Sequence, residues 1–376
     1  AEYGLLYWLL KEIETDKKLK LQLVVTGMHL SSKFGLTYKE IETDFKIDKK
    51  INLSLTADTS QGISNSMSIA QRSFSKTYDE LKPDIILVLG DRYEIFSSVV
   101  AAMIARIPVA HIHGGEITKG VIDDAIRHCI TKMSQIHFVA AKEYLKRLVQ
   151  LGENKKNIFN VGGMGIENIK RLKLLSRKEF EKSINFKLNK KNILVTFHPI
   201  TLEKNKSKIH FQELLKCVSD LKDTNIIFTK ANSDMGGKII NKMIDHYINK
   251  NRKNSIGVTS LGQVRYLSAL QYVDVVVGNS SSGLLEAPSF KIATINIGDR
   301  QSGRIKANSI VDCLPNKKSI RIAFKKVYSK KFQNNLKNVK NPYGEGCASK
   351  KITKVLKNIK LKGILKKGFF NIKFSI

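Results

Sequence analysis

The chain has 376 residues, of which 42% are hydrophobic and 26% charged, a balance typical of globular proteins. This length exceeds what a single ordinary core accommodates and suits two domains. No run approaches the ~20 consecutive apolar residues that span a bilayer, so the sequence predicts no membrane insertion.

The formal net charge of +32 comes from 65 Lys and Arg residues against 33 Asp and Glu residues. The lysines are spread along the whole chain, which indicates a solvated basic surface that favours anionic substrates. We therefore expect no nucleic-acid partner, while a polyanion-binding protein stays open as a function of a different class. The four cysteines are far apart and lack C-x-x-C spacing, which predicts reduced thiols and a cytoplasmic location.

The first half of the chain predicts strands that alternate with helices. Apolar residues between positions 5 and 13 fall on one helical face. Short apolar runs predict buried strands at 21–27, 84–89, 107–112 and 136–140, with a weaker signal at 158–163. A Rossmann unit opens with a strand, whereas this chain opens on a helix. We therefore expect a first strand and its turn, about ten residues, upstream of Ala1.

The second half repeats this pattern after a charged stretch at 170–191. Its predicted strands lie at 192–197, 225–229, 274–278 and 293–297. Strands and helices that alternate at this spacing imply parallel, doubly wound sheets. The sequence therefore predicts an α/β fold of two Rossmann-like doubly wound domains facing a cleft, with residues 1–178 in the first and 179–376 in the second.

The basic end of the chain, residues 351–367, contains apolar residues at helical spacing. These residues are Ile352, Val355, Leu356 and Ile359. A packed terminal helix is therefore a better interpretation of this segment than a polyanion-binding tail. This helix could pack back on the first domain.

Charged residues follow the strand predicted at 84–89. Gly90 lets the backbone approach a ligand, and Asp91 and Arg92 place opposite charges at the strand end. A local ion pair beside a helix start explains the same residues without a ligand. Because ligands of doubly wound sheets bind beyond the carboxyl ends of strands, Asp91 and Arg92 are candidate site residues.

The next predicted strand leads into a segment with three further candidates, which are His113, Glu116 and Asp123. Two consecutive glycines in this segment bring the main chain close to a ligand. Asp123 and Arg127 lie four residues apart on one helical face, as do Asp124 and His128. Carboxylates beside Arg and His suit proton transfer with an adjustable pKa. A salt-bridged helix start is the competing interpretation.

In the second half, His198 stands where the strand at 192–197 ends, a position typical of ligand contact. The run 278–286 follows a strand and opens a predicted helix, so hydroxyl and backbone N–H groups converge into a phosphate cradle. Its candidate residues are Ser280, Ser281, Ser282, Gly283 and Glu286. Glu286 could hold a ribose diol. An ordinary serine N-cap explains part of this run.

The segment 298–304 supplies Arg300 and Arg304 at another strand end, and guanidinium forks match phosphate groups or nucleobase edges. A solvated loop is the alternative interpretation. Neither G-x-G-x-x-G nor G-x-x-x-x-G-K-[ST] occurs in the sequence, which argues against a dinucleotide enzyme or a P-loop kinase. No metal-ligand spacing is convincing.

Taken together, the motifs GDRYEIF, HIHGGE, IDDAIRH, FHP, GNSSSGLLEAPS and INIGDRQSGR resemble those of the hydrolysing UDP-N-acetylglucosamine 2-epimerases of bacterial sialic-acid synthesis. The resemblance runs in order from Ala1 to about Lys351. It implies a GT-B-like fold and glycal chemistry, in which UDP leaves C1 as the C2 proton is removed. Water then adds to the 2-acetamidoglucal and yields N-acetylmannosamine. The resemblance also implies a UDP-sugar substrate, UDP as product, no cofactor, no metal, and a homo-oligomer that is a dimer or tetramer.

By this resemblance, Asp91 and Asp123 match the acid/base carboxylates of the family, and His198 matches the histidine that contacts the leaving diphosphate. The positions that match nucleotide- and substrate-contacting residues are Ser280 and Ser281 (phosphate), Glu286 (ribose), Arg300 (uracil or UDP), and Arg92 and Asn232 (substrate side). The carried-over residues thus divide into proton-transfer groups in the first half and nucleotide-binding groups mostly in the second.

One position departs from the family pattern, because some relatives carry a catalytic Glu where this chain has His113. His113 itself, Glu116 or Glu2 could serve as the second proton-transfer group instead. The family's turn before the first helix contributes an arginine, and that position would precede Ala1.

Three related functions stay open beside this one. The closest keeps the fold and the chemistry but hydrolyses UDP-2,4-diacetamido-2,4,6-trideoxy-glucose, as in legionaminic-acid synthesis. A non-hydrolysing 2-epimerase would keep UDP attached to the sugar. A glycosyltransferase of similar fold would need an acceptor to release UDP.

Overall fold

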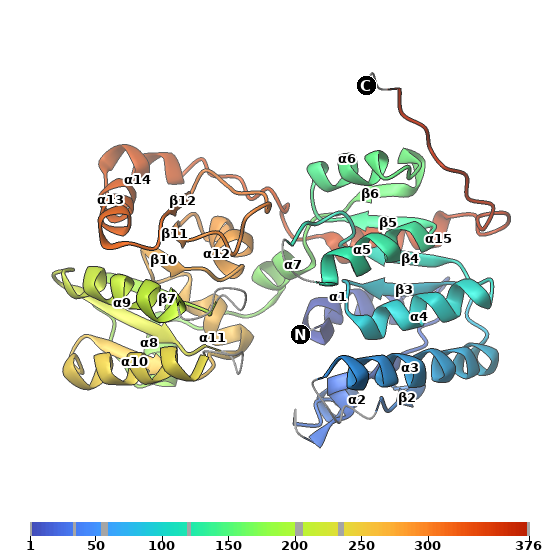
Figure 1. The fold of residues 1–376 in the computed structure, drawn as a ribbon, viewed down its shortest axis with the longest axis horizontal. Coiled ribbons are helices and arrows are strands. Elements are labelled where there is room, and N and C mark those ends of the chain that lie inside the picture. Colours follow the sequence, from blue (N-terminus) through green and yellow to red (C-terminus); the bar gives the residue numbers. More distant parts are fainter. Residues whose placement is uncertain are drawn as a thin grey trace. The chain divides into compact units, whose positions relative to one another are not determined.

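The computed structural model describes residues 2–32, 35–53, 59–118, 122–199, 206–231 and 237–373. The chain divides into two compact α/β units (Figure 1). Unit 1 comprises Ala1–Glu167 and Gly346–Ile376, and unit 2 comprises Asn168–Glu345. The chain thus enters unit 2 before the boundary predicted at residue 178. Its last segment, which the sequence places in the second domain, belongs to unit 1.

A four-stranded parallel sheet in the order β3-β4-β5-β6 forms the centre of unit 1. Its strands are β3 (Ile86–Leu89), β4 (Val109–Ile112), β5 (Ile136–Val139) and β6 (Ile158–Asn160). A separate parallel pair consists of β1 (Val24–Thr26) and β2 (Lys49–Ile51). The strand β2 is missed by the sequence prediction because its three residues, KKI, include two lysines and give no apolar signal.

Both faces of the unit 1 sheet are apolar, because alternate residues of a strand point to opposite sides. Val88 and Val109 lie in one buried cluster, whereas Leu89 and Ala110 lie in another. The helices of this part of the chain are α1 (Glu2–Glu14), α2 (Tyr38–Asp44), α3 (Ser60–Leu81), α4 (Tyr93–Ile104), α5 (Ile122–Met133), α6 (Lys142–Gln150) and α7 (Met164–Arg171). Burial on both faces explains why these strands are continuous apolar runs in the sequence.

The terminal helix α15 (Ala348–Asn358) lies in unit 1 (Figure 1). Its Ala348 and Ile352 share a buried cluster with Leu9 and Ile13 of α1. This apolar face is the physical reason why the end of the chain packs with the unit that contains its beginning.

Unit 2 contains a six-stranded parallel sheet in the order β12-β11-β10-β7-β8-β9. Its strands are β7 (Lys191–Thr196), β8 (Thr224–Thr229), β9 (Ser255–Val258), β10 (Val275–Gly278), β11 (Ala293–Ile297) and β12 (Ile310–Cys313). The inner strands coincide with the predicted runs, whereas the edge strands β9 and β12 are missed. These edge strands are only partly buried, so their sequences, SIGV and IVDC, lack a continuous apolar signal.

Helices cover both faces of the unit 2 sheet. Ile193 and Val195 of β7 lie in one buried cluster and Leu194 lies in the other. The helices are α8 (Arg177–Ile184), α9 (Lys206–Ser219), α10 (Gly237–Lys250), α11 (Gly262–Ala269), α12 (Ser282–Leu285), α13 (Lys317–Val327) and α14 (Lys330–Leu336). Throughout the described ranges, no helix is long and apolar enough to cross a membrane. Each unit is therefore a parallel sheet whose strands end at one edge, where ligand-binding residues gather in such folds.

Candidate active site

One arginine in unit 1 joins the carboxyl end of β3 to the start of α5. The Arg127 side chain, only 6% exposed, forms one ion pair with Asp91 and another, of 3.0 Å, with Asp124. Its Nη1 also donates to the Glu116 carbonyl at 2.8 Å. The sequence places Asp123 on the helical face of Arg127, whereas the described ion pairs of Arg127 go to Asp91 and Asp124. Arg127 therefore holds together the segments that carry the candidate carboxylates.

Asp123 lies in the first turn of α5. Burial raises the pKa of the Asp123 carboxyl above its ordinary value, and the negative charge of Asp91 raises it further. The guanidinium groups of Arg127 and Arg92 act in the opposite direction but do not cancel the shift. Because a carboxylate with a raised pKa is a stronger base, Asp123 suits proton abstraction and return.

Gly90 and His113 follow neighbouring strands and both have left-handed backbones, with φ of +83° and +68°. Glycine adopts this conformation freely, whereas a non-glycine residue there costs on the order of 1–3 kcal/mol, and such strain clusters at functional sites. His113 Nε2 accepts from the Met164 N–H at 3.2 Å, and its Nδ1 lies 3.6 Å from Glu116 Oε1. This geometry fits a neutral imidazole whose proton is on Nδ1 and faces the Glu116 carboxylate.

Three charged residues line a cavity of about 310 Å³ in unit 1, namely Glu2, Arg92 and Glu94. Arg92 donates to the Glu94 carboxylate through Nε at 3.2 Å and Nη2 at 3.3 Å. Glu94 is buried. Acidic residues are common in the first turn of a helix, so the sequence around Glu94 does not indicate that this side chain is buried. The guanidinium of Arg92 is thus held by an acid that sequence reasoning missed.

In unit 2, one buried asparagine connects three strand ends. Asn279 Oδ1 accepts from the His198 N–H at 2.7 Å, and its Nδ2 donates to the His198 carbonyl at 2.8 Å. The Asn279 carbonyl accepts from Arg300 Nη1 at 3.1 Å and from Gln301 Nε2 at 2.9 Å. Because β10 lies between β7 and β11, Asn279 fixes the predicted histidine and the predicted arginine relative to the serine run.

The turn before Asn279 requires glycine. Gly278 has φ of +136°, and a Cβ there would lie 1.9 Å from the Thr196 carbonyl oxygen on the neighbouring strand. Any larger residue would push β10 and β7 apart at the point where His198 and Asn279 meet.

The serine run opens a helix, as the sequence predicts, and this helix is short. The helix α12 has four residues and continues as a 3-10 turn that contains Pro288, a residue that cannot extend an α-helical hydrogen-bond ladder. Ser280 Oγ lies 3.2 Å from Ser282 Oγ, which also contacts the Tyr266 hydroxyl. Hydroxyl groups and Arg300, and not a helix dipole, are therefore the groups that could hold a phosphate here.

Gly283 serves packing, because a Cβ at this position would lie 2.7 Å from Thr294 Cγ2 on β11. Glu286 has a shielded Oε2 without a hydrogen-bond partner among the described residues. Burial raises the pKa of Glu286 to about 7. An unpaired buried acceptor is costly, which fits the predicted contact with a diol that donates two hydrogen bonds. Asn232, also predicted on the substrate side, lies outside the described residues.

A sequence model of the family described as UDP-N-acetylglucosamine 2-epimerase matches residues 11–357. The chain belongs to this family. A Campylobacter jejuni relative named "GDP/UDP-N,N'-diacetylbacillosamine 2-epimerase (hydrolyzing)" is 46% identical over 373 residues, which cover 99% of this chain and 97% of the relative. An Escherichia coli relative named "Polysialic acid biosynthesis protein P7" is 38% identical over 375 residues, with 99% and 95% covered.

Among solved structures, a putative UDP-N-acetylglucosamine 2-epimerase from Listeria monocytogenes is similar with a TM-score of 0.81 at 17% identity, covering 99% of this chain and 96% of that one. This likeness shows a shared fold, so the predicted α/β, GT-B-like class with two Rossmann-like units is confirmed. The predicted family is also confirmed, and the chain is an enzyme, since its relatives are named as 2-epimerases.

Sequence reasoning about this 2-epimerase found the strand-end residues but missed the groups that connect them. The missed residues are Glu94, Arg127 as the partner of Asp91, Asn279 and Gln301. The sequence places Arg127 beside Asp123 on one helical face, but the contact of Arg127 with Asp91, 36 positions away, has no local signal. Asn279 carried a weaker signal, as an amide between a buried strand and three serines.

Proposed function

We propose that this chain is a hydrolysing 2-epimerase whose substrate is a UDP-linked 2,4-diacetamido-2,4,6-trideoxy sugar, UDP-N,N'-diacetylbacillosamine. The observation that carries this proposal is 46% identity, over nearly the whole of both chains, to the C. jejuni relative of that name. UDP-N-acetylglucosamine is the second candidate, supported by the description of the family whose model matches residues 11–357. The sequence prediction ranked these two sugars in the opposite order.

In the proposed reaction, unit 1 carries the proton transfers. A base takes the proton from C2 as the C1–O bond breaks and UDP leaves with the bonding electrons, which forms a C1=C2 double bond. The oxygen of water then adds to C1 and a proton returns to C2 on the other face. Asp123, whose pKa is raised, suits one of these transfers, and Asp91 or the His113–Glu116 pair suits the other.

Unit 2 would hold the nucleotide. The negative charge that develops on the departing diphosphate would be stabilised by Arg300 and by the hydroxyls of Ser280 and Ser281, groups already fixed in place before the reaction. His198 would contact the same diphosphate, and Glu286 would accept hydrogen bonds from the ribose diol. None of these roles requires a metal ion.

The test is to incubate the enzyme with UDP-N,N'-diacetylbacillosamine, its GDP-linked counterpart and UDP-N-acetylglucosamine, and to measure free nucleotide and reducing sugar. We expect fastest release of UDP from the first, with deuterium from D₂O at C2 of the product. A product that keeps its nucleotide would contradict hydrolysis. Fastest turnover of UDP-N-acetylglucosamine would instead support the second candidate. Preference for the GDP-linked sugar would contradict uracil as the nucleobase of the substrate.

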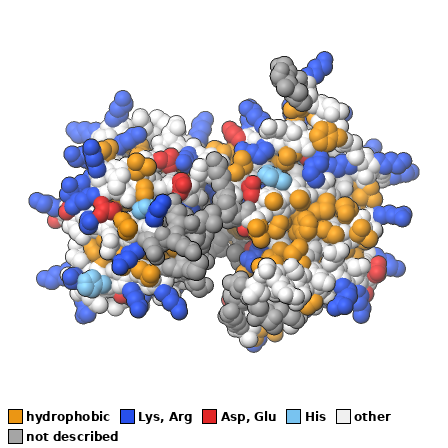
Figure 2. Space-filling view, viewed as in Figure 1, with side chains coloured by type: hydrophobic (Ala, Val, Ile, Leu, Met, Phe, Trp, Pro, Cys, Tyr) orange, Lys and Arg blue, Asp and Glu red, His pale blue; other side chains and the backbone are white. Residues whose placement is uncertain are grey.

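We also propose that the enzyme is a homo-oligomer, built through the exposed apolar residues near the end of α4. Met103 is 48% exposed and Ile104 is 72% exposed. Figure 2 shows an apolar area on unit 1 that few Lys or Arg side chains interrupt. In a chain of net charge +32, a second copy that presents this same uncharged area brings few like charges together. Ile104→Glu should lower the mass measured by light scattering, whereas Ile322→Glu, at an exposed site in unit 2, should not.

A further inference from the structure

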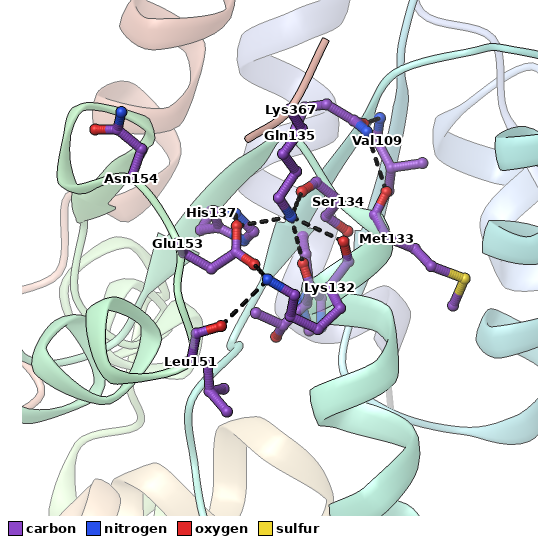
Figure 3. A network of polar contacts seen from close by, with 12 residues as sticks. Val109, Lys132, Met133, Ser134, Gln135, His137, Leu151, Glu153, Asn154 and Lys367 are labelled. Carbon is purple, nitrogen blue, oxygen red and sulfur yellow. Dashed lines mark hydrogen bonds and ion pairs between the residues drawn. The ribbon is translucent and has the colours of Figure 1, made fainter. Parts of the chain in front are cut away.

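The end of the chain places one lysine of unit 1 among protein oxygens (Figure 3). Lys367 Nζ lies 2.6 Å from Glu153 Oε2, 2.8 Å from the Lys132 carbonyl and 2.6 Å from the Ser134 carbonyl. It also donates to the Thr131 carbonyl at 3.3 Å. The Thr131 and Lys132 carbonyls belong to the last turn of α5 and Ser134 follows it, so the ammonium lies at a helix C-terminus, where a cation is favourable.

The carboxylate beside Lys367 is buried and fully engaged. Glu153 is 1% exposed and accepts from Lys132 Nζ at 2.7 Å and from His137 Nε2 at 3.0 Å. Burial alone would raise the pKa of Glu153, but its hydrogen-bond donors lower it to about 2. Burial lowers the pKa of His137, so the imidazole is neutral and donates its Nε2 proton. Removing the ammonium of Lys367 would leave a buried carboxylate with one cation fewer, which is strongly unfavourable.

The segment after Lys367 contacts Gly152, a position where only glycine leaves space for it. The Phe370 N–H donates to the Gly152 carbonyl at 2.8 Å. A Cβ on Gly152, whose φ is +82°, would lie 2.4 Å from the Phe369 ring. The same ring lies 4.9 Å from Lys132 Nζ. The tail is therefore docked at several points and Lys367 is not an isolated surface contact.

A continuous set of hydrogen bonds leads from Lys367 to the turn that carries Asp91. Thr131, whose carbonyl faces Lys367, has its Oγ1 3.3 Å from His111 Nδ1. His111 Nε2 lies 2.8 Å from the carbonyl of Gly90, the residue before Asp91. Burial lowers the pKa of His111 to about 3, so the imidazole is neutral. Its Nε2–H donates to Gly90, and its Nδ1 accepts from the Thr131 hydroxyl.

We propose that Lys367 is a positioning residue for the acid/base groups of unit 1. By holding the last turn of α5, it fixes Thr131 and, through His111, the Gly90–Asp91 turn. The same helix carries Asp123 in its first turn and Arg127 near its middle. This inference rests on the proposed function for its kinetic readout, but the geometry it describes can be measured without turnover.

The first test compares Lys367→Met with Lys366→Met, an exposed neighbour, and with the conservative Lys367→Arg. We expect Lys367→Met to lower kcat on the order of tenfold, since misplacing a catalytic group by about 1 Å can cost about 10²-fold. The Kd of UDP should not change, because the residues assigned to the nucleotide are in unit 2. Lys366→Met should behave as the parent enzyme, and Lys367→Arg should regain most of the lost kcat.

A double-mutant cycle with Thr131→Val tests the path. Because Thr131→Val removes the hydroxyl that meets His111, Lys367→Met should lower kcat less in that background than in the parent. Independent, multiplicative losses would overturn the path through Thr131. A lower Tm with unchanged kcat in Lys367→Met would overturn the proposal, since it would show a purely structural tail.

Amide hydrogen exchange separates this inference from the proposed function. Exchange at residues 90–92 should rise in Lys367→Met and stay at the parent level in Lys366→Met, whichever sugar is turned over. A parent enzyme that releases no nucleotide from any of the three sugars overturns the proposed function. Unchanged exchange at residues 90–92 in Lys367→Met overturns the positioning role alone.

Discussion

Unit 1 and unit 2 have the same parallel, doubly wound plan but differ in the chemistry that connects their strand ends. In unit 1 the connection is ionic, with Arg127 between Asp91 and Asp124. In unit 2 it is neutral, with the amide and carbonyl of Asn279 between His198 and Arg300. Both sets of contacts lie at the carboxyl ends of parallel strands, although β3 is an edge strand of its sheet and β10 is an inner strand.

This difference teaches how one fold can be fitted to two tasks. Neighbouring charges shift the pKa of the groups they surround, as Asp91 does for Asp123, and a shifted pKa is what proton transfer uses. A neutral amide such as that of Asn279 fixes geometry without titrating, so the contacts of Asn279 with His198 and Arg300 keep their charge state as the pH changes. The comparison predicts that changes in unit 1 act on kcat and changes in unit 2 act on nucleotide affinity.

The largest effect is expected from Asp123→Asn in unit 1. The amide has the volume of the carboxylate but cannot accept the proton, so kcat should fall by about 10²–10⁴-fold. The Kd of UDP and the Tm should stay near the parent values. The rate of nucleotide release at saturating substrate measures kcat, and calorimetric titration with UDP measures the Kd.

Asp124→Asn is the matched control, since Asp124 is adjacent on the same turn and pairs with Arg127. It should cost less than Asp123→Asn, because its carboxylate positions the arginine and transfers no proton. Equal losses in the two variants would show that Asp123 has no special part in the chemistry. A large loss of UDP affinity in either variant would contradict the assignment of proton transfer to unit 1 and of nucleotide binding to unit 2.

The parts of this arrangement that the sequence predicts are those with a local signal. The predicted strands are continuous apolar runs, and Asp91, His198 and Ser280 each lie two residues beyond the end of one of these strands in the structure. The edge strand β12 is short and half-buried, so neighbouring residues do not reveal it. The short length of α12 follows from Pro288, which cannot extend an α-helical hydrogen-bond ladder and which the sequence prediction left out.

Contacts between distant segments could not be predicted at all. The pair of Asp91 and Arg127 joins residues 36 positions apart, and Lys367 meets the carbonyl of Thr131 across 236 positions. Such contacts depend on how the whole chain packs, and a single sequence carries no local pattern for them. The basic tail therefore gave no indication that one of its lysines would be enclosed.

A smaller effect is expected from Asn279→Asp in unit 2. The substitution keeps the acceptor for the His198 N–H but removes the donor to the His198 carbonyl and adds a buried charge. An unsatisfied buried group costs about 1–3 kcal/mol, so the Tm should fall and UDP should bind about tenfold more weakly. Saturating substrate should restore most of kcat. A kcat loss as large as that of Asp123→Asn would contradict the assignment of unit 2 to binding.

The smallest effect is expected from Glu286→Gln. In the parent enzyme, the contributions of Glu286 to the free energy of unfolding and to UDP affinity should change in opposite directions with pH. Burial raises the pKa of Glu286 from 4.5 to about 7 in the folded chain. Its contribution to the free energy of unfolding is therefore fully present below pH 4.5 and is lost as the pH rises through about 7.

A ribose diol donates to the ionised carboxylate, so the affinity for UDP should change in the opposite direction. It should weaken by up to about tenfold per pH unit as the pH falls below the folded pKa. Glu286→Gln should flatten both dependences, measured by chemical denaturation and by UDP titration between pH 5 and about pH 8. If the pH dependence of UDP affinity survives in Glu286→Gln, Glu286 does not hold the ribose. Its buried Oε2 would then belong to the packing of unit 2 and not to its ligand.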